Sequence, residues 1–81
     1  MTYTDSMRRA FHSVGHFKPK GLEAVLVDNE HFLVLRVSER SFMRLADEDK
    51  RRAVEYMARA KKALEDNGAV VLLVREGGKE Q

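Results

Sequence analysis

The three histidines are the residues of this chain whose type and spacing first suggest chemistry. His12 and His16 are four residues apart, the spacing that places two imidazoles on one face of a helix, where both can bind a metal ion. Gly15 lies between them at a predicted helix end, no third ligand is nearby, and His31 falls in a separate polar turn. The sequence therefore predicts surface histidines, no metal site and no cofactor.

Catalytic arrangements are equally weak in this sequence. Ser13 follows His12, but no G-x-S-x-G elbow surrounds it that would expose its hydroxyl as a nucleophile. Asp28 and Glu30 lie in a polar turn, where nothing would desolvate the two carboxylates for acid–base work. The glycines do not form a phosphate-binding loop. We predict that the chain is not an enzyme and has no catalytic residue.

The composition is that of one small domain. The chain has 81 residues, of which 43% are hydrophobic and 35% charged, enough to build a core and too apolar for disorder. It has no cysteine, which excludes disulfides and thiolate sites. No leader pattern opens the chain, and its longest apolar run, residues 69–74, is far shorter than a membrane span. We expect a single domain over residues 1–81, located in a reducing cytoplasm and without a membrane partner.

Positive charge gathers at the N-terminus. Residues 1–21 carry four lysines and arginines against one aspartate, a surplus of three, while the whole chain has a net charge of +2. Cations can neutralise phosphates, and an exposed aromatic ring among them can stack on a base. The nucleic-acid contacts predicted on this basis are Arg8, Arg9, Phe17, Lys18 and Lys20. Arg36, Arg40 and Arg44 would extend this patch if the second strand and the turn after it lie nearby. In the alternative interpretation Phe17 packs into the core and the cations only solubilise the surface.

Hydrophobic periodicity defines the first half of the chain. Met7, Phe11 and Val14 form the apolar stripe of a first helix, followed by a basic linker over residues 15–21. Residues 22–27 and 32–37 are rich in aliphatic residues and flank a polar tetrapeptide, which predicts a β-hairpin. Residues 33, 35 and 37 give its second strand one uninterrupted apolar face.

The second half is predicted to hold a long helix and a last strand. Residues 38–41 are a predicted turn, with a short helical turn at residues 42–45. The long helix runs from Glu48 to about Asp66 and ends at an Asn-Gly pair. Its predicted core side consists of Ala53, Val54, Met57, Ala60 and Leu64. The stretch AVVLLVRE, residues 69–76, is the last strand, and residues 77–81 are a frayed tail.

These elements predict a small α+β domain of order α-β-β-α-β with a three-stranded sheet. We expect the strand order 2-1-3, with 1-2-3 as the alternative, and the long helix packed on one face. The N-terminal helix would cover part of the other face or lie across an edge. This element order resembles that of KH modules of the second kind, which bind RNA or single-stranded DNA. The GXXG loop that clamps the backbone in that family is missing, so the resemblance implies no residue roles.

The last strand carries the main functional prediction. It falls at a sheet edge and has no charged or proline residue over residues 69–74, although edge strands are normally protected by such residues. We predict that it pairs with its twin across a two-fold axis; in the alternatives the N-terminal segment covers it, or another protein adds a strand. The predicted interface residues are Val70, Val71, Leu72, Leu73 and Val74. The predicted function is that of a small non-enzymatic protein-binding, adaptor or regulatory protein, homodimeric through this strand. The alternative is a nucleic-acid-binding module that uses the basic N-terminal segment.

Overall fold

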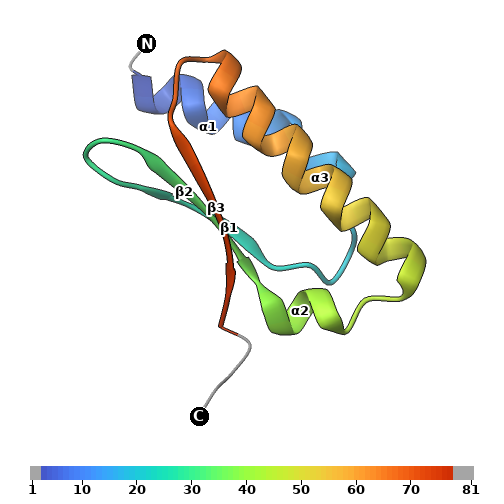
Figure 1. The fold of residues 1–81 in the computed structure, drawn as a ribbon. Coiled ribbons are helices and arrows are strands. Elements are labelled where there is room, and N and C mark those ends of the chain that lie inside the picture. The colour runs from blue at the N-terminus through green and yellow to red at the C-terminus, as the bar shows by residue number, and fades with distance from the viewer. Residues whose placement is uncertain (1–2, 78–81) are drawn as a thin grey trace.

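The computed structural model describes residues 3–77 and has the predicted α+β architecture (Figure 1). Its elements are α1 (Tyr3–Ser13), the 3-10 helix η1 (Gly15–Phe17), β1 (Ala24–Asp28), β2 (Leu33–Ser38), α2 (Glu39–Met43), α3 (Asp47–Asp66) and β3 (Val71–Glu76). Two helices, α2 and α3, therefore connect β2 to β3. The predicted tail lies outside the described residues except for Gly77.

The sheet has the strand order β1-β2-β3, with β2 antiparallel to β1 and parallel to β3. The preferred prediction of 2-1-3 is therefore wrong, and the stated alternative of 1-2-3 is correct. The physical reason is the apolar face of β2. Leu35 is fully buried in the central position, where it pairs with Leu26 of β1 on one side and Leu73 of β3 on the other. A central strand is flanked by side chains on both sides, and the most apolar strand gains most from that position.

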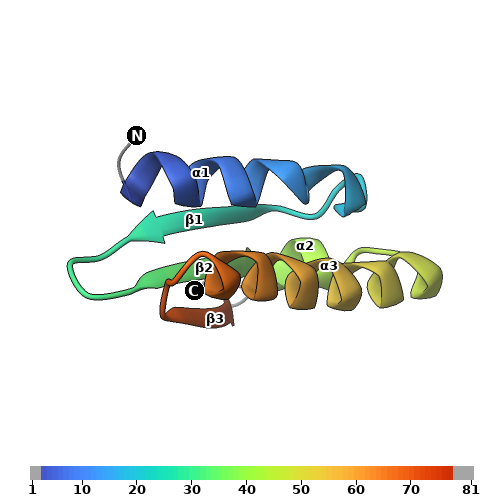
Figure 2. The ribbon, with the colours of Figure 1, turned by 90° about the horizontal axis from the view of Figure 1, so that it is seen from above.

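Both long helices pack on the same face of the sheet (Figures 1 and 2). We call this the inner face and the opposite one the outer face. Figure 2 shows α3 over β2 and β3, with α1 beside it, over and beyond β1. The N-terminal helix thus adds to the inner layer at the β1 side, so it neither covers the outer face nor lies across the edge of the last strand, the two places expected for it. No helix covers the outer face in the part of the chain that the structure describes.

The core lies between the two helices and the inner face of β2, as the uninterrupted apolar face of residues 33, 35 and 37 predicts. Met7 of α1 and Leu22 before β1 complete it from the N-terminal side. The buried residues of α3 are Ala53, Tyr56, Met57, Ala60 and Leu64. Val54 was predicted among them but is 54% exposed, because it lies about 100° around the helix from Ala53. Tyr56 takes the buried place instead.

A pair of serines joins α2 to the sheet. Ser38 caps α2, since its Oγ accepts a hydrogen bond from the Ser41 N–H at 3.1 Å. The buried Ser41 hydroxyl donates to the Ser38 carbonyl at 2.9 Å and accepts from the Glu23 N–H at 3.0 Å. The predicted turn at residues 38–41 is in fact a helix start, and it is tied to the beginning of β1.

The buried hydroxyl of Tyr56 makes the free energy of unfolding depend on pH in the alkaline range. Burial raises the pKa of its hydroxyl above the ordinary value of 10.0, so the folded state holds this proton more tightly than the unfolded chain. The resulting stability is fully present below pH 10 and is lost as the pH rises through the folded-state pKa. We expect urea unfolding to show that Tyr56→Phe loses less free energy of unfolding than the parent chain above pH 10. Equal losses in the two chains would contradict this.

Candidate functional site

The last strand directs apolar side chains to both faces of the sheet, as predicted. Val71 is buried on the inner face, and Leu73 on the same face is 40% exposed. Leu72, 47% exposed, and the half-buried Val74 point to the outer face. Val70 precedes the strand and is exposed. The five predicted interface residues therefore lie on three different surfaces: the core, the outer face and the sheet edge.

The backbone of β3 leaves one row of hydrogen-bonding groups at the sheet edge. The Leu33 N–H donates to the Val70 carbonyl at 2.9 Å, which fixes the residues of β3 that bond to β2. By the alternation of a parallel ladder, Val71, Leu73 and Arg75 turn their N–H and C=O groups to the edge. No other strand of the described chain pairs with that edge. An edge of this kind is a template for a further strand.

The outer face carries an apolar surface bordered by one ion pair. Its apolar side chains come from all three strands: Val25, Val27, Val34, Leu72 and Val74. At one end of this surface the Arg36 Nε donates to the Glu76 carboxylate at 2.6 Å, which joins β2 to β3. Uncovered apolar surface of this kind marks interaction sites on soluble proteins.

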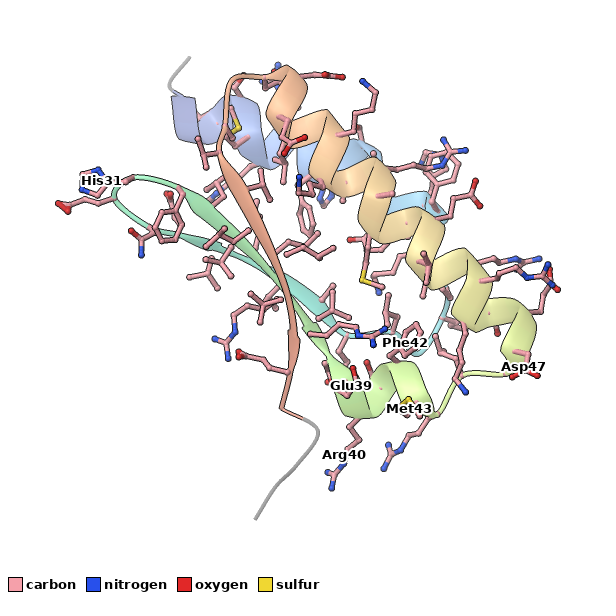
Figure 3. All side chains as sticks on the ribbon, in the orientation of Figure 1. His31, Glu39, Arg40, Phe42, Met43 and Asp47 are labelled. Atoms are coloured by element: carbon pink, nitrogen blue, oxygen red, sulfur yellow. The ribbon has the colours of Figure 1, made fainter. Side chains whose placement is uncertain are left out.

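Arg75 fixes α2 against the end of β3. Its Nε lies 2.9 Å from the Glu39 carboxylate, and its guanidinium lies 4.5 Å from the centroid of the Phe42 ring. Glu39 and Phe42 project from α2 toward the sheet in Figure 3. The strand predicted as an interface is therefore held in place at its C-terminal end by a charge and a ring from α2.

The predicted nucleic-acid contacts lie on α1 and in the linker after it, and the aromatic ring among them contacts other side chains. Arg8 and Arg9 are exposed on α1 and have no ion-pair partner among the described residues. Phe17 is 40% exposed, but the Arg59 guanidinium lies over its ring, 4.2 Å from the centroid. The His16 ring lies at the same distance. Phe17 therefore neither enters the core nor offers an open face for stacking.

The linker cations lie toward the opposite end of the helical layer from the N-terminus of α1. The Lys18 ammonium donates to the Leu22 carbonyl at 2.9 Å, whereas Lys20 is exposed. Gly21, with φ at +97°, places this linker against Leu45 in the connection between α2 and α3. The linker thus contacts a part of the chain that the sequence does not place near it.

A second group of exposed cations lies on and after α2 and consists of two arginines that the sequence offers as an extension of the predicted contacts. Arg40 and Arg44 have no ion-pair partner within residues 3–77, and Met43 beside them is 57% exposed. Figure 3 shows Arg40 pointing away from the rest of the fold. These side chains line an open cavity of about 620 Å³ together with Glu39, Arg75 and Glu76.

The histidines do not converge. His31 lies at the tip of the β1–β2 hairpin in Figure 3, away from the helix that carries His12. Within residues 3–77 no three His, Cys, Asp or Glu side chains are close enough to share a metal ion. In the same range no helix has the length and apolar content that crossing a bilayer requires.

No protein-family model matches this chain, and no curated protein and no solved structure is significantly similar to it. The function of the chain is therefore inferred from the geometry of its own residues.

The contact of Arg75 with α2 gives a test of how β3 is held. We expect Arg75→Ala to lower the free energy of unfolding by about 1 kcal/mol, because a partly exposed ion pair and a cation–π contact are lost together. In a chain of this size that corresponds to about 4–8 °C in Tm, measured by circular dichroism. Arg40→Ala is the matched control and should leave Tm unchanged. Equal shifts in both variants would contradict this role of Arg75.

Proposed function

We propose that this chain is a small non-enzymatic binding protein that assembles with a second copy of itself through the free edge of β3. The observation that carries the proposal is the row of unpaired backbone groups at Val71, Leu73 and Arg75, in a strand without charge or proline at its centre. The charged residue of β3 that points to the inner face is Arg75, which lies near the C-terminal end of the strand and is paired with Glu39.

A second copy fits this edge in a self-complementary way. If the two-fold axis passes through Leu73, the outward backbone groups of the two Leu73 residues form a hydrogen-bonded antiparallel pair. Leu72 of each copy then lies opposite Val74 of the other on the outer face, and Val71 lies opposite Arg75 on the inner face. This register keeps the two Arg75 side chains apart and gives each half-exposed Leu73 an apolar neighbour.

Pairing would also enlarge the apolar surface that each copy leaves uncovered. The two three-stranded sheets would become one sheet of six strands, and the outer-face valines and leucines would form a continuous surface. A chain of 81 residues buries a smaller share of its surface than a larger domain, so association is an effective way for it to gain burial. A surface of this extent suits an adaptor or regulatory role.

Leu73→Lys tests the β3 edge. In the proposed register it places two ammonium groups opposite each other at the axis, and like charges across a strand pair are unfavourable. We expect light scattering to give a mass near twice 9.3 kDa for the parent chain and a monomer for Leu73→Lys. Leu73 suits the test because it is half-exposed, whereas lysine at the buried Val71 would damage the fold itself.

Val25→Lys is the matched control, since Val25 is an exposed valine of the opposite edge strand. It should leave the mass unchanged. A monomeric parent chain, or a Leu73→Lys variant that stays dimeric, would contradict the proposed pairing. Loss of the dimer in both variants would assign the contact to the outer face instead.

A second candidate function, nucleic-acid binding, is favoured by the cations around the α2–α3 connection. Gly21 faces Leu45 of this connection, Arg44 begins the connection, and Arg40 and the exposed Met43 lie on α2 before it. With α2 present, the element order has the second central helix of KH modules of the second kind. The connection itself reads Arg44, Leu45, Ala46, without the glycines that let a nucleic-acid backbone approach. This candidate is therefore secondary.

Salt dependence tests the second candidate. If Arg40 and Arg44 contact phosphates, replacing both by glutamine should weaken binding of a fluorescent single-stranded oligonucleotide and lower the slope of log K against log salt by about 2. The matched control is the pair Arg51→Gln and Arg52→Gln, because these arginines are already paired with Glu48 and Asp49. No binding by the parent chain, or equal losses in both double variants, would exclude these contacts.

A further inference from the structure

We propose that the edge of β1 beneath α1 binds an extended, acidic segment of another protein as a fourth strand. This site is at the β1 edge of the sheet, and the β3 edge is at the other end of the strand order, so the site does not depend on the pairing proposed above. It also gives the cations of α1 a different role from phosphate binding.

The helical layer is wider than the sheet it covers. Two helices packed side by side cover about 20 Å, the width of about four strands, because helix axes lie about 10 Å apart and strands about 4.8 Å apart. The sheet has three strands, and α3 covers β2 and β3. Figure 2 shows α1 lying over and beyond β1, where a fourth strand would be. The described chain places no strand in that position.

The backbone of β1 is oriented to accept such a strand. The Ser38 N–H donates to the Glu23 carbonyl, and the Asn29 N–H donates to the Phe32 carbonyl, each at 2.9 Å. These two bonds fix the alternation of the antiparallel ladder. The residues of β1 whose N–H and C=O groups turn away from β2 are Ala24, Leu26 and Asp28.

Two cavities under α1 lie where the inner side chains of an added strand would point. One, of about 330 Å³, has an apolar lining from Met7, Phe11, Leu26 and Leu33, with Arg8, His12 and Asp28 as its polar groups. The second, of about 420 Å³, is lined by Phe11, His12, Gly15, His16, Lys18, Ala24 and Tyr56. They share Phe11 and His12, and the second has no acidic lining residue.

The spacing of the cavities matches the repeat of a strand. The first lies beside Leu26 and the second beside Ala24, two residues apart on β1. Alternate side chains of an added strand have the same spacing, about 7 Å, so one residue would enter each cavity. Both cavities have apolar walls, and the groove carries Arg8 and Lys18 against the single carboxylate of Asp28. The partner that fits is an extended segment with two apolar residues at alternate positions and acidic residues flanking them.

The test uses the full chain and a synthetic peptide with blocked ends. Its centre is two valines separated by one serine, and each side continues with a serine and then an aspartate, so that it fits in either strand direction. On titration, we expect the amide signals of Ala24, Leu26 and Asp28 to shift in nuclear magnetic resonance spectra and to gain protection from hydrogen exchange. The same peptide with N-methyl groups on the amides that face β1 should not bind.

Charge and specificity are tested with a neighbouring pair of arginines. Arg8→Glu should weaken peptide binding about fivefold, because an attraction becomes a repulsion at the groove, whereas Arg9→Glu on the same helix should leave it unchanged. Lysine in place of the peptide's aspartates should weaken binding to the parent chain in the same way. Ala24→Pro removes a donor at the edge and should abolish binding while the fold, followed by circular dichroism, is retained.

Several results would overturn the proposal. The first is that no amide signal shifts at millimolar peptide, and the second is that the amide signals of Val71 and Leu73 shift instead of those of β1. The third is that Arg8→Glu and Arg9→Glu lose peptide affinity equally. A single-stranded oligonucleotide that shifts the β1 amides when the peptide does not would assign the groove to nucleic acid. Failure of the β3 dimer would leave the expected β1 shifts unchanged, so the two proposals fail separately.

Discussion

The burial of one face of β2 is the constraint on which the rest of this structure depends. Leu33, Leu35 and Val37 are almost inaccessible to solvent, and a central strand with both helices above it is the arrangement that achieves this. Because α1 and α3 both pack on that face, neither of them covers the outer face of the sheet. The exposed outer face and the two open edges are consequences of how the core is closed.

The two open edges differ in physical character. The β3 edge has apolar side chains on both faces from Val71 to Val74, which suits a copy of the same strand. The β1 edge lies beneath the overhanging α1, between cavities lined by basic and apolar side chains, which suits a strand of different composition. One small domain can therefore combine self-assembly with recognition of a second chain. The cations on and after α2 lie on a third surface and can serve a separate role.

The sequence-based predictions succeeded where a strong local pattern was present. The alternating apolar residues of β2 predicted this strand, and the apolar stripe of α3 predicted this helix. Together the two patterns predicted most of the core. The predictions failed at the flanks of the α3 stripe: Val54 on one flank is exposed and Tyr56 on the other is buried, because packing against the sheet selects the buried side of a helix to within a fraction of a turn. The strand order failed for a related reason, since hairpin and crossover rules allow β3 on either side of the hairpin.

The sequence by itself determined the α+β class, the hairpin, the long helix and the uncharged last strand, because period, turn residues and composition act over short distances along the chain. Only the tertiary structure decided that α1 joins α3 on the inner face, that Arg59 covers Phe17, and that Arg8 lies above the edge of β1. These arrangements depend on contacts between segments far apart in sequence. Their free energies come from burying surfaces together, and a local pattern does not specify which surfaces meet.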